Sequence, residues 1–539
     1  MKIRIPSRSY FDRTHKVVGP MDMGVLYPVC CDEVYPGDSF RDRTESMVRL
    51  EAMIKPTMHE YNIFFHWFYV RDWTIMDDFE DMIFAGADGE STSVVPFNED
   101  QVTIAEGDLL DWLGCNPGVY AADYFSMLPV RCYNKIYNDW YRNQNTESTE
   151  VSLDSLDLQH RCWERDYFTG GMPWAQRGPV VALPLGTTAP VIGNGKVLGL
   201  WTSDGTNNYP GYGLSTSTWT GAGGSLIAAK NAAGNNVGID LSTVDNLAEF
   251  APRRGVGVST YASSSGLVAD LTHATAATFD SWMVACQIQA WQRMNGIAGV
   301  RYVEGVKAHF GVNTPDARVE RAEYLGGGKS PIVISEVLQT SSTDSTTPQG
   351  NLAGHGIGAN VTNGFKRTFT EHGFLMCICS IMPRTSYQQG FDPMFFRKTH
   401  LDFMTPEFSR LGFRPVPVKY LYTGAYLDSN GDVVSPTASG ATWTPVTDPD
   451  KTFNYQAIYN ELRYKPSSVH GTMRSSESYW TGSRIFSTEP QFNDEFVKCT
   501  PSKRMFAVQS DDYPVCKVEI VHHLDCFREL PKDGMPWSF

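Results

Sequence analysis

Two short stretches combine positive charge with aromatic rings, a mixture suited to binding single-stranded nucleic acid. Their residues are Phe396, Arg397, Lys398, Arg463, Tyr464 and Lys465. Guanidinium and ammonium groups neutralise phosphates, and the neighbouring rings offer planes on which unpaired bases stack. These two stretches are therefore the candidate nucleic-acid-facing residues of the sequence.

Possible metal ligands occur at two places, and at both the spacing favours a structural role. Residues 428–432, DSNGD, have the spacing of the first ligands of a calcium loop, but Val433 stands where that loop requires glycine. A hairpin turn at Asn430-Gly431 explains the same residues better. His522 and His523 are adjacent in a predicted strand, so their side chains point to opposite faces. We therefore predict no metal site and interpret His522 as a histidine at the edge of the core.

Motifs for cofactor binding and catalysis are absent or incomplete. Residues 354–359, GHGIGA, match a loose dinucleotide-binding pattern, but Ser, Thr and Pro precede them where a strand is required. We interpret them as a flexible loop. The acidic segment 77–81 fits a solvated helix face better than a pair of catalytic carboxylates. Neither GxSxG nor HExxH occurs. The sequence predicts no cofactor and no enzymatic activity.

The clearest structural element is a β-strand at residues 61–70, YNIFFHWFYV. Aromatic and β-branched residues fill nearly every position, which suits a pleated strand better than a helix. Odd-numbered residues fall on one face and even-numbered residues on the other, and both faces are largely apolar. Ten extended residues span roughly 33 Å, which indicates a large sheet. A shorter strand is predicted at residues 47–54, ending before Pro56.

Further strand signals lie toward the end of the chain. Residues 373–382 are apolar on both faces, as in a central covered strand. Residues 515–524 alternate apolar and polar side chains, as in a half-buried strand, and we expect them in the main sheet. Residues 311–365 contain Gly326-Gly327-Gly328 and a Ser/Thr-rich run, and we interpret them as loop.

Helices and one region of distinct composition separate the early and late strands. Apolar residues at helical spacing predict a helix at residues 129–142 and helical structure at 269–310, broken near Gly296 and Gly299. Gly, Ser, Thr, Ala and Asn dominate residues 186–266, which we interpret as a variable surface insertion.

The domain organisation follows from these segments. Residues 1–20 are basic and lack an apolar pattern, so they form an extended N-terminal arm. No clean linker divides the rest, and residues 21–539 are expected to form one domain with long insertions, among them 186–266.

Composition restricts the class of protein. The chain has 539 residues, of which 42% are hydrophobic and 19% charged, as in a globular protein of low charge. A formal net charge of −15 argues against a surface that binds nucleic acid everywhere, while leaving room for a local basic face. Eleven cysteines without a CxxC pair favour reduced, packed thiols in a reducing cytoplasm. The longest apolar run, residues 373–382, is too short to span a bilayer, so no membrane insertion is expected.

Several blocks of the sequence, in the same order, resemble the major capsid protein of the Microviridae, and most closely the gokushovirus group. The resemblance runs from about residue 11 to residue 531, and residues 186–266 depart from it. The blocks are FDRTHKVVGPMDMGVLYPVCCDEVYPGDSF followed by TMHEYNIFFHWFYV, YNDWYRNQN with RDYFTGGMPWAQRG, HFGVNTPDARVERAEYLGGG, RTSYQQGFDPMFFRKTHLDFMTPEFSRLG, and ELRYKPSSVHGTMRSSESYW.

The resemblance implies an all-β core, an eight-stranded antiparallel viral jelly roll (β-sandwich) whose long loop insertions contain several helices. It implies that sixty copies form a T=1 icosahedral shell, with residues 186–266 protruding at the threefold axes. The implied partners are a single-stranded DNA genome, a small basic internal DNA-binding protein and other virion proteins. On this basis the basic-aromatic residues face the interior, and the insertion is a hypothetical surface for a host receptor. The protein would be a virion component assembled in the host bacterial cytoplasm.

One alternative from another class remains. A secreted β-sandwich carbohydrate-binding protein or glycoside hydrolase would also use many aromatic residues, and the chain has 13 Trp and 25 Tyr. Such a protein needs a signal peptide or a pair of carboxylates in a cleft, and the sequence indicates neither.

Overall fold

The computed structural model describes residues 8–86, 90–179, 181, 279–338, 352–510 and 513–532, together with short strands between residues 191 and 269. The chain divides into two compact units. One contains residues 1–178 and 292–539, and the other contains residues 179–291.

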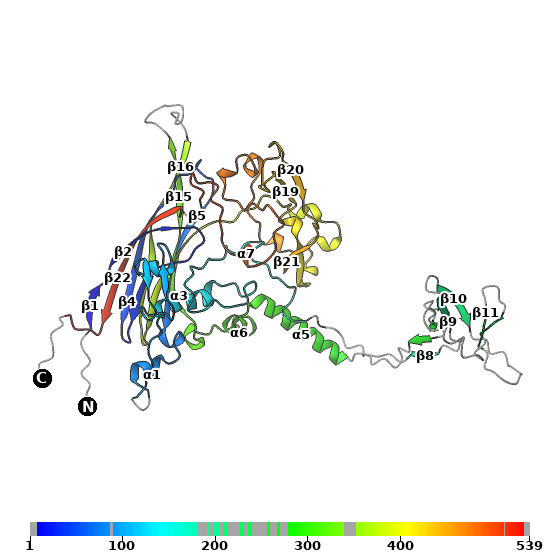
Figure 1. Cartoon of the computed structure of the whole chain (residues 1–539), viewed down its shortest axis with the longest axis horizontal. Helices are drawn as coiled ribbons and strands as arrows, with labels where there is room; N and C mark the ends of the chain where they lie inside the picture. The colour runs from blue at the N-terminus through cyan, green and yellow to red at the C-terminus, as the bar shows by residue number, and fades with distance from the viewer. Residues whose placement is uncertain are drawn as a thin grey trace. The chain divides into compact units, whose positions relative to one another are not determined.

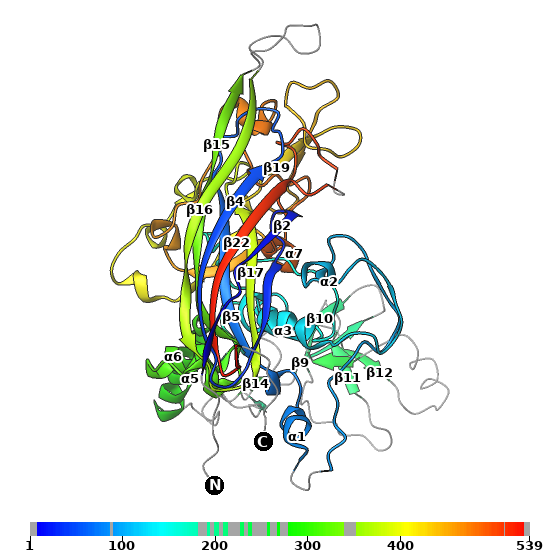
Figure 2. The ribbon, with the colours of Figure 1, turned by 90° about the vertical axis from the view of Figure 1, so that its left-hand side faces the viewer.

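The larger unit is built on an antiparallel sheet whose strands come from both ends of the chain (Figure 1). The strands are β1 (Ser9–Asp12), β2 (His15–Met21), β3 (Tyr27–Val34), β4 (Ser39–Leu50), β5 (Tyr61–Arg71), β15 (Glu323–Leu338), β16 (Leu352–Thr368), β17 (Gly373–Pro383) and β22 (Cys516–Arg528). Their order is β1-β22-β4-β16-β15-β5-β17-β3, and β2 also pairs with β22. In Figure 2, β15, β16, β4, β22 and β2 lie side by side, with β5 and β17 behind them.

Strand β15 joins the two halves of this sheet. Its residues 323–332 pair with β5, whereas residues 333–338 pair with β16. The sheet therefore curls, so that β2, β22, β4 and β16 form one half and β15, β5, β17 and β3 form the other. The long β15–β16 pair also carries the connection between the halves.

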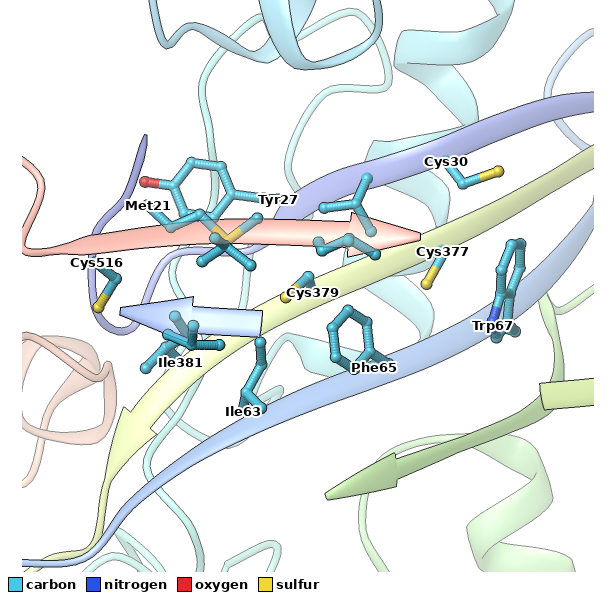
Figure 3. Close-up of a cluster of buried hydrophobic side chains, with 14 of the residues drawn as sticks. Met21, Tyr27, Cys30, Ile63, Phe65, Trp67, Cys377, Cys379, Ile381 and Cys516 are labelled. Atoms are coloured by element: carbon cyan, nitrogen blue, oxygen red, sulfur yellow. The ribbon is translucent and has the colours of Figure 1, made fainter. Parts of the chain in front are cut away.

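The main hydrophobic core contains side chains from both halves of the sheet. Ile63, Phe65 and Trp67 of β5 belong to the same buried cluster as Cys377 of β17 and Cys516 of β22 (Figure 3). Burying one large apolar side chain contributes roughly 1.5–3 kcal/mol, so this cluster is a main source of stability. The predicted strand at 61–70 is confirmed as β5, with its odd-numbered residues in this core.

The opposite face of β5 packs against a helix. Phe68 and Val70 share a second buried cluster with Tyr133 and Ile136 of α3 (Leu128–Ile136). Helix α3 continues directly into a π-helical turn, η2 (Tyr137–Tyr141). The helix predicted at 129–142 is therefore present, although its last turn is widened. The shorter helices of this region are α1 (Phe79–Phe84) and α2 (Leu109–Trp112).

A third buried cluster lies under the loops between β17 and β22, where Tyr167 and Phe168 pack with Leu421, Phe453 and Phe496. Short elements shape these loops. They include η5 (Pro393–Phe396), η6 (His400–Asp402), η7 (Phe408–Arg410), β18 (Phe413–Pro417), η8 (Val418–Tyr420), β19 (Gly424–Leu427), β20 (Thr442–Pro445), β21 (Thr452–Ala457), η9 (Asn460–Leu462), η10 (Gly471–Arg474), η11 (Ser478–Trp480) and α7 (Asp494–Val497).

The interpretation of residues 311–365 as loop is wrong, because β15 and most of β16 lie there. Their glycines serve close strand packing. A Cβ at Gly327 would overlap the carbonyl oxygen of Phe65 on β5, and one at Gly356 would lie 2.5 Å from Cδ1 of Leu50. GHGIGA is likewise part of β16, not a flexible loop.

Two other strand predictions need correction. The strand predicted at 47–54 runs from Ser39 to Leu50 and ends well before Pro56. Its inward positions include the buried polar residues Asp42, Thr44 and Ser46, which hide the apolar alternation. The turn at Asn430-Gly431 exists, but β19 pairs mainly with β20.

The other predicted strands and helices stand as follows. The strand predicted at 373–382 is the fully buried β17 (Gly373–Pro383), between β5 and β3. The strand predicted at 515–524 corresponds to β22, which begins at Cys516 and lies between β2 and β4. Of the helical region predicted at 269–310, the part from residue 279 on is confirmed as α5 (Phe279–Ala298) and α6 (Tyr302–Phe310), with Gly299, at φ +101°, between them. Ala269 instead ends the short strand β14 (Leu267–Ala269), and residues 270–278 lie outside the described residues. Gly296 lies inside α5, so it does not break the helix.

The described part of the basic N-terminal arm is extended, and it pairs with β22 through β1 and β2. Residues 1–7 lie outside the described ranges. All eleven cysteines are free thiols and seven of them are buried, as the prediction of packed thiols requires. Within the described ranges, no helix combines the length and the apolarity needed to cross a membrane.

The smaller unit is described only in part. Its strands are β8 (Val191–Gly193), β9 (Gly199–Ser203), β10 (Asn208–Gly213), β11 (Ile227–Lys230), β12 (Asn236–Ile239), β13 (Val256–Val258) and β14 (Leu267–Ala269). They form small antiparallel pairings, among them β9 with β10 and β13. The insertion predicted at 186–266 falls within this unit, and most of it lies outside the described residues.

Candidate nucleic-acid interface

The two basic-aromatic stretches, 66 positions apart by the numbering of Arg397 and Arg463, come together in the folded chain. Arg397 follows η5, and a guanidinium nitrogen lies 3.9 Å from the carboxylate of Glu461 in η9. Lys465 reaches back in the same way, with its Nζ 3.7 Å from the carboxylate of Asp392. The two stretches therefore form one site.

The six predicted residues differ in accessibility. Lys398, Arg463, Tyr464 and Lys465 are exposed, while Phe396 and Arg397 are half-buried. The ring of Phe396 stacks on Tyr420 with 5.7 Å between centroids. On this evidence Phe396 is held within the protein, whereas the Tyr464 ring is accessible to a base.

The arrangement of Arg397 limits what it can bind. Its guanidinium lies 5.8 Å from the ring centre of Phe403 and is also paired with Glu461. An arginine with a carboxylate partner neutralises a phosphate less effectively than a free one, because the two anions compete. The exposed cations Lys398 and Arg463 are therefore better placed to contact phosphate.

Asp402 organises the turn that presents Lys398. Its Oδ2 accepts the backbone N–H groups of Thr399 at 2.8 Å and Lys398 at 3.0 Å. These hydrogen bonds, with a further one from Arg414, lower the pKa of Asp402 below its ordinary value. The turn is consequently fixed by an anion, which partly offsets the positive charge of the site.

Exposed apolar side chains occur on the same chain segments as this site, and sequence reasoning missed them. We call them the apolar patch: Phe391, Met394, Phe395, Leu401, Phe403, Met404, Leu411 and Leu462, with exposed fractions between 43% and 69%. Ring contacts connect part of the patch, such as Phe391 with Phe395 at 6.4 Å. A dense group of exposed apolar residues is a mark of an interaction surface. The signal was present in the sequence as the aromatic, turn-rich segment 391–411.

The chemistry of catalysis and metal binding is not indicated by the described residues. Among them, no three His, Cys, Asp or Glu side chains are grouped to hold a metal ion. Asp428 uses Oδ1 to accept the N–H groups of Asn430 and Asp432, which is the turn predicted for residues 428–432. The buried His522 lies beside Thr44, with Nδ1 3.0 Å from the hydroxyl. Burial lowers the pKa of His522 to about 3, so it is a neutral core residue.

The exposed apolar patch indicates a protein that associates with another protein surface, and the described residues give no sign of a catalytic or metal site. Comparison with known proteins identifies which kind. The family model described as "Capsid protein (F protein)" matches residues 2–537. The chain therefore belongs to the capsid protein (F protein) family.

Curated relatives support the same assignment over nearly the whole chain. Capsid protein VP1 of Chlamydia phage 1 is 30% identical, covering 98% of this chain and 95% of the relative. Capsid protein VP1 of Bdellovibrio phage phiMH2K is also 30% identical, and the match covers 99% of this chain and 97% of that relative. Capsid protein VP1 of Spiroplasma virus 4 is 26% identical, covering 98% and 95%. The chain is a phage capsid protein, a structural component of the virion, as its resemblance to the Microviridae implied.

Proposed function

We propose that copies of this chain assemble into a closed T=1 icosahedral shell of sixty subunits around a single-stranded DNA genome. The observation that carries the proposal, beyond family membership, is the apolar patch on the larger unit. Exposed Phe, Met and Leu side chains in such number favour burial against a second protein surface. In a one-protein shell that surface is another copy, and heterologous contacts that close around symmetry axes give a finite particle.

We further propose that the framework is an eight-stranded jelly roll. The pairing order supports it if β1 and β2 count as one interrupted edge strand along β22. The eight strands, numbered in sequence, then pair in the orders 1-8-3-6 and 2-7-4-5. Two four-stranded halves around a common core are the arrangement expected of two Greek keys.

The charge of the chain bears on how DNA is enclosed. A net charge of −15 means that the chain does not neutralise DNA as a whole. We propose that Lys398, Arg463, Tyr464 and Lys465 face the interior and order a few nucleotides, assisted less by Phe396 and Arg397. A small basic internal protein would supply most of the neutralisation.

The insertion at 186–266 is proposed to form the threefold protrusions and to bind a host receptor. Its support is its distinct composition and its departure from the otherwise matching blocks. Assembly is proposed to occur in the host bacterial cytoplasm. Deleting the insertion should abolish adsorption to the host while leaving shells intact, and unchanged adsorption would contradict the receptor role.

Assembly is tested by expressing the full chain with its virion partners and imaging the particles by electron microscopy. We expect closed shells with the wild-type chain and few or none with Phe395→Ser combined with Phe403→Ser. Phe84→Ser, an equally polar change at an exposed phenylalanine of α1, is the matched control. Normal shells from the double variant would remove the apolar patch from the assembly mechanism.

The DNA contacts need a separate readout. Replacing Arg463 and Lys465 by Ala should lower affinity for single-stranded DNA and reduce its salt dependence by roughly 0.7 per lost phosphate contact. Lys532→Ala, which removes a positive charge near the end of the described residues and away from these two stretches in sequence, is the control for a general effect of lost charge. A cryo-EM map with the Arg463 and Lys465 side chains on the outer surface would contradict the inward orientation.

A further inference from the structure

A cavity of about 290 Å³ lies on the face of β5 opposite the main hydrophobic core, and none of the basic-aromatic residues lines it. Its walls are His66, Phe68, Trp140, Tyr141, Arg161, Cys162 and Tyr324. Five of these seven side chains carry rings. The volume lies near the lower limit of about 300 Å³ for small-ligand pockets, so the cavity fits one compact planar group.

The rings are arranged as a continuous enclosure around Phe68. The Phe68 ring centre lies 5.8 Å from Trp140, 6.0 Å from Tyr141 and 5.6 Å from Tyr324. Trp140 and Tyr324 are themselves 5.7 Å apart, and His66 closes the circle at 5.9 Å from both Tyr141 and Tyr324. These separations are typical of aromatic contacts, so the walls are positioned by one another.

Two departures from regular secondary structure create this enclosure. Trp140 and Tyr141 project from the π-helical turn η2, and Tyr324 lies where the pairing of β15 with β5 changes register before Gly326. π-turns and β-bulges are enriched at functional sites, because they redirect side chains at a local cost. Their coincidence at one cavity indicates a binding site more strongly than either would alone.

Polar groups of the cavity fit a base attached to a phosphate. His66 Nδ1 lies 2.7 Å from the Tyr141 hydroxyl, and burial, with the nearby Arg161, lowers the pKa of His66 to about 3. The imidazole is therefore neutral and can meet the edge of a base. Arg161 donates to the Ser380 hydroxyl at 3.1 Å, and within the described ranges no carboxylate is bonded to it. Its guanidinium thus supplies positive charge at the cavity wall.

Two further contacts hold the pocket rigid. The indole N–H of Trp140 donates to the carbonyl of Ala322 at 2.8 Å, and Arg321 lies over the indole ring at 3.7 Å. Phe68 is only 2% exposed. Tyr324 is 42% exposed, so its ring lies at the mouth of the cavity, where a ligand would enter.

From this geometry we propose that the cavity binds one unstacked nucleobase of single-stranded DNA, with Arg161 contacting the adjoining phosphate. The proposal rests on the proposed enclosure of a single-stranded DNA genome and adds a second, independent contact to it. The base stacks against Tyr324 and the rings beside it, and the neutral His66 meets its polar edge. Stacking is tolerant of base identity, so the pocket selects an unpaired base, not a sequence.

The test measures binding of a fluorescent oligothymidylate to the unassembled full chain by anisotropy, alongside an oligonucleotide of equal length that lacks bases. We expect Tyr324→Ala to weaken binding of oligothymidylate by about fivefold to a hundredfold, the effect of losing one stacking ring. The abasic probe should be affected little. Tyr324→Phe should bind like the wild type, because it retains the ring. Tyr124→Ala, at an exposed tyrosine elsewhere, is the control.

Arg161→Gln should lower the affinity for both oligonucleotides. Arg165→Gln removes the same charge from the neighbouring surface and should lower these affinities less. If Tyr324→Ala does not fold, density for a base in the cavity of a particle map provides the second measurement. Equal affinities of the wild type and Tyr324→Ala, or a polypeptide side chain in the cavity, would overturn the proposal. Shells that form and hold DNA despite an empty cavity would overturn it too, while leaving the proposed capsid function standing.

Discussion

Replacing Gly327 by alanine tests the conclusion that glycines of β15 serve strand packing. A Cβ at this position would overlap the carbonyl oxygen of Phe65 and approach the Tyr324 hydroxyl at 2.9 Å, where contacts under 3.0 Å essentially do not occur. Backbone cannot move aside as a flexible side chain can. The two strands must therefore separate locally around the Gly327 and His66 pair.

Two contributions determine how much Gly327→Ala lowers the free energy of unfolding. Overpacking costs about 1–3 kcal/mol. Each ladder hydrogen bond weakened by strand separation adds about 1 kcal/mol. The expected loss for Gly327→Ala is therefore about 2–5 kcal/mol in the free energy of unfolding.

The matched control, Gly305→Ala, is expected to raise the free energy of unfolding instead of lowering it. Gly305 lies inside helix α6, and a Cβ built there meets nothing within 4 Å. Alanine in a helix interior is favoured over glycine by about 0.5–1 kcal/mol, so Gly305→Ala should stabilise the chain. Thermal unfolding of both purified variants, followed by intrinsic tryptophan fluorescence, measures the difference. A Gly327→Ala midpoint equal to or above that of the wild type would refute the packing role.

Three further outcomes are expected. Burial raises the pKa of Asp42 from 3.8 to about 6, so stability present at low pH is lost as the pH rises between these values. Asp42→Asn should abolish that decline and raise stability at pH 7 by about 2–3 kcal/mol, as pH-dependent unfolding would reveal. Arg71 is buried between Glu323 and Glu371, and the buried Glu323 also pairs with the more exposed Arg367. Arg71→Met should lower the free energy of unfolding by about 3 kcal/mol, because Glu323 loses its buried partner and keeps only Arg367, as thermal unfolding would reveal. Cys286 is the exposed thiol, so Cys286→Ser should remove the fastest phase of thiol labelling in the unassembled chain.

Strands with a clear apolar pattern, either continuous or alternating, could be predicted from the sequence. β5 and β17 are covered on both faces and read as continuous apolar segments, and β22 shows clear alternation. β15 and β16 could not be recognised in the same way. Their glycines signal loops locally, and the reason for them, the close approach of strands β5 and β4, exists only in the folded sheet.

The candidate site was predictable in composition but not in arrangement. Residues such as Arg463 and Tyr464 could be selected by type, since cations beside rings suit nucleic acid. That Arg397 would be paired with Glu461 depends on the loops that bring η5 and η9 together. The cavity beside Tyr324 also escaped notice, because a π-turn and a register shift leave no periodic signal.

The position of β22 has a consequence for the timing of synthesis. This strand, residues 516–528, pairs with β4 along nearly its whole length and with β2 through residues 516–522. Until β22 has been synthesised, the two early strands lack the partner that joins them. A chain that stops before residue 516 therefore cannot complete this half of the framework and is poorly suited to join a particle.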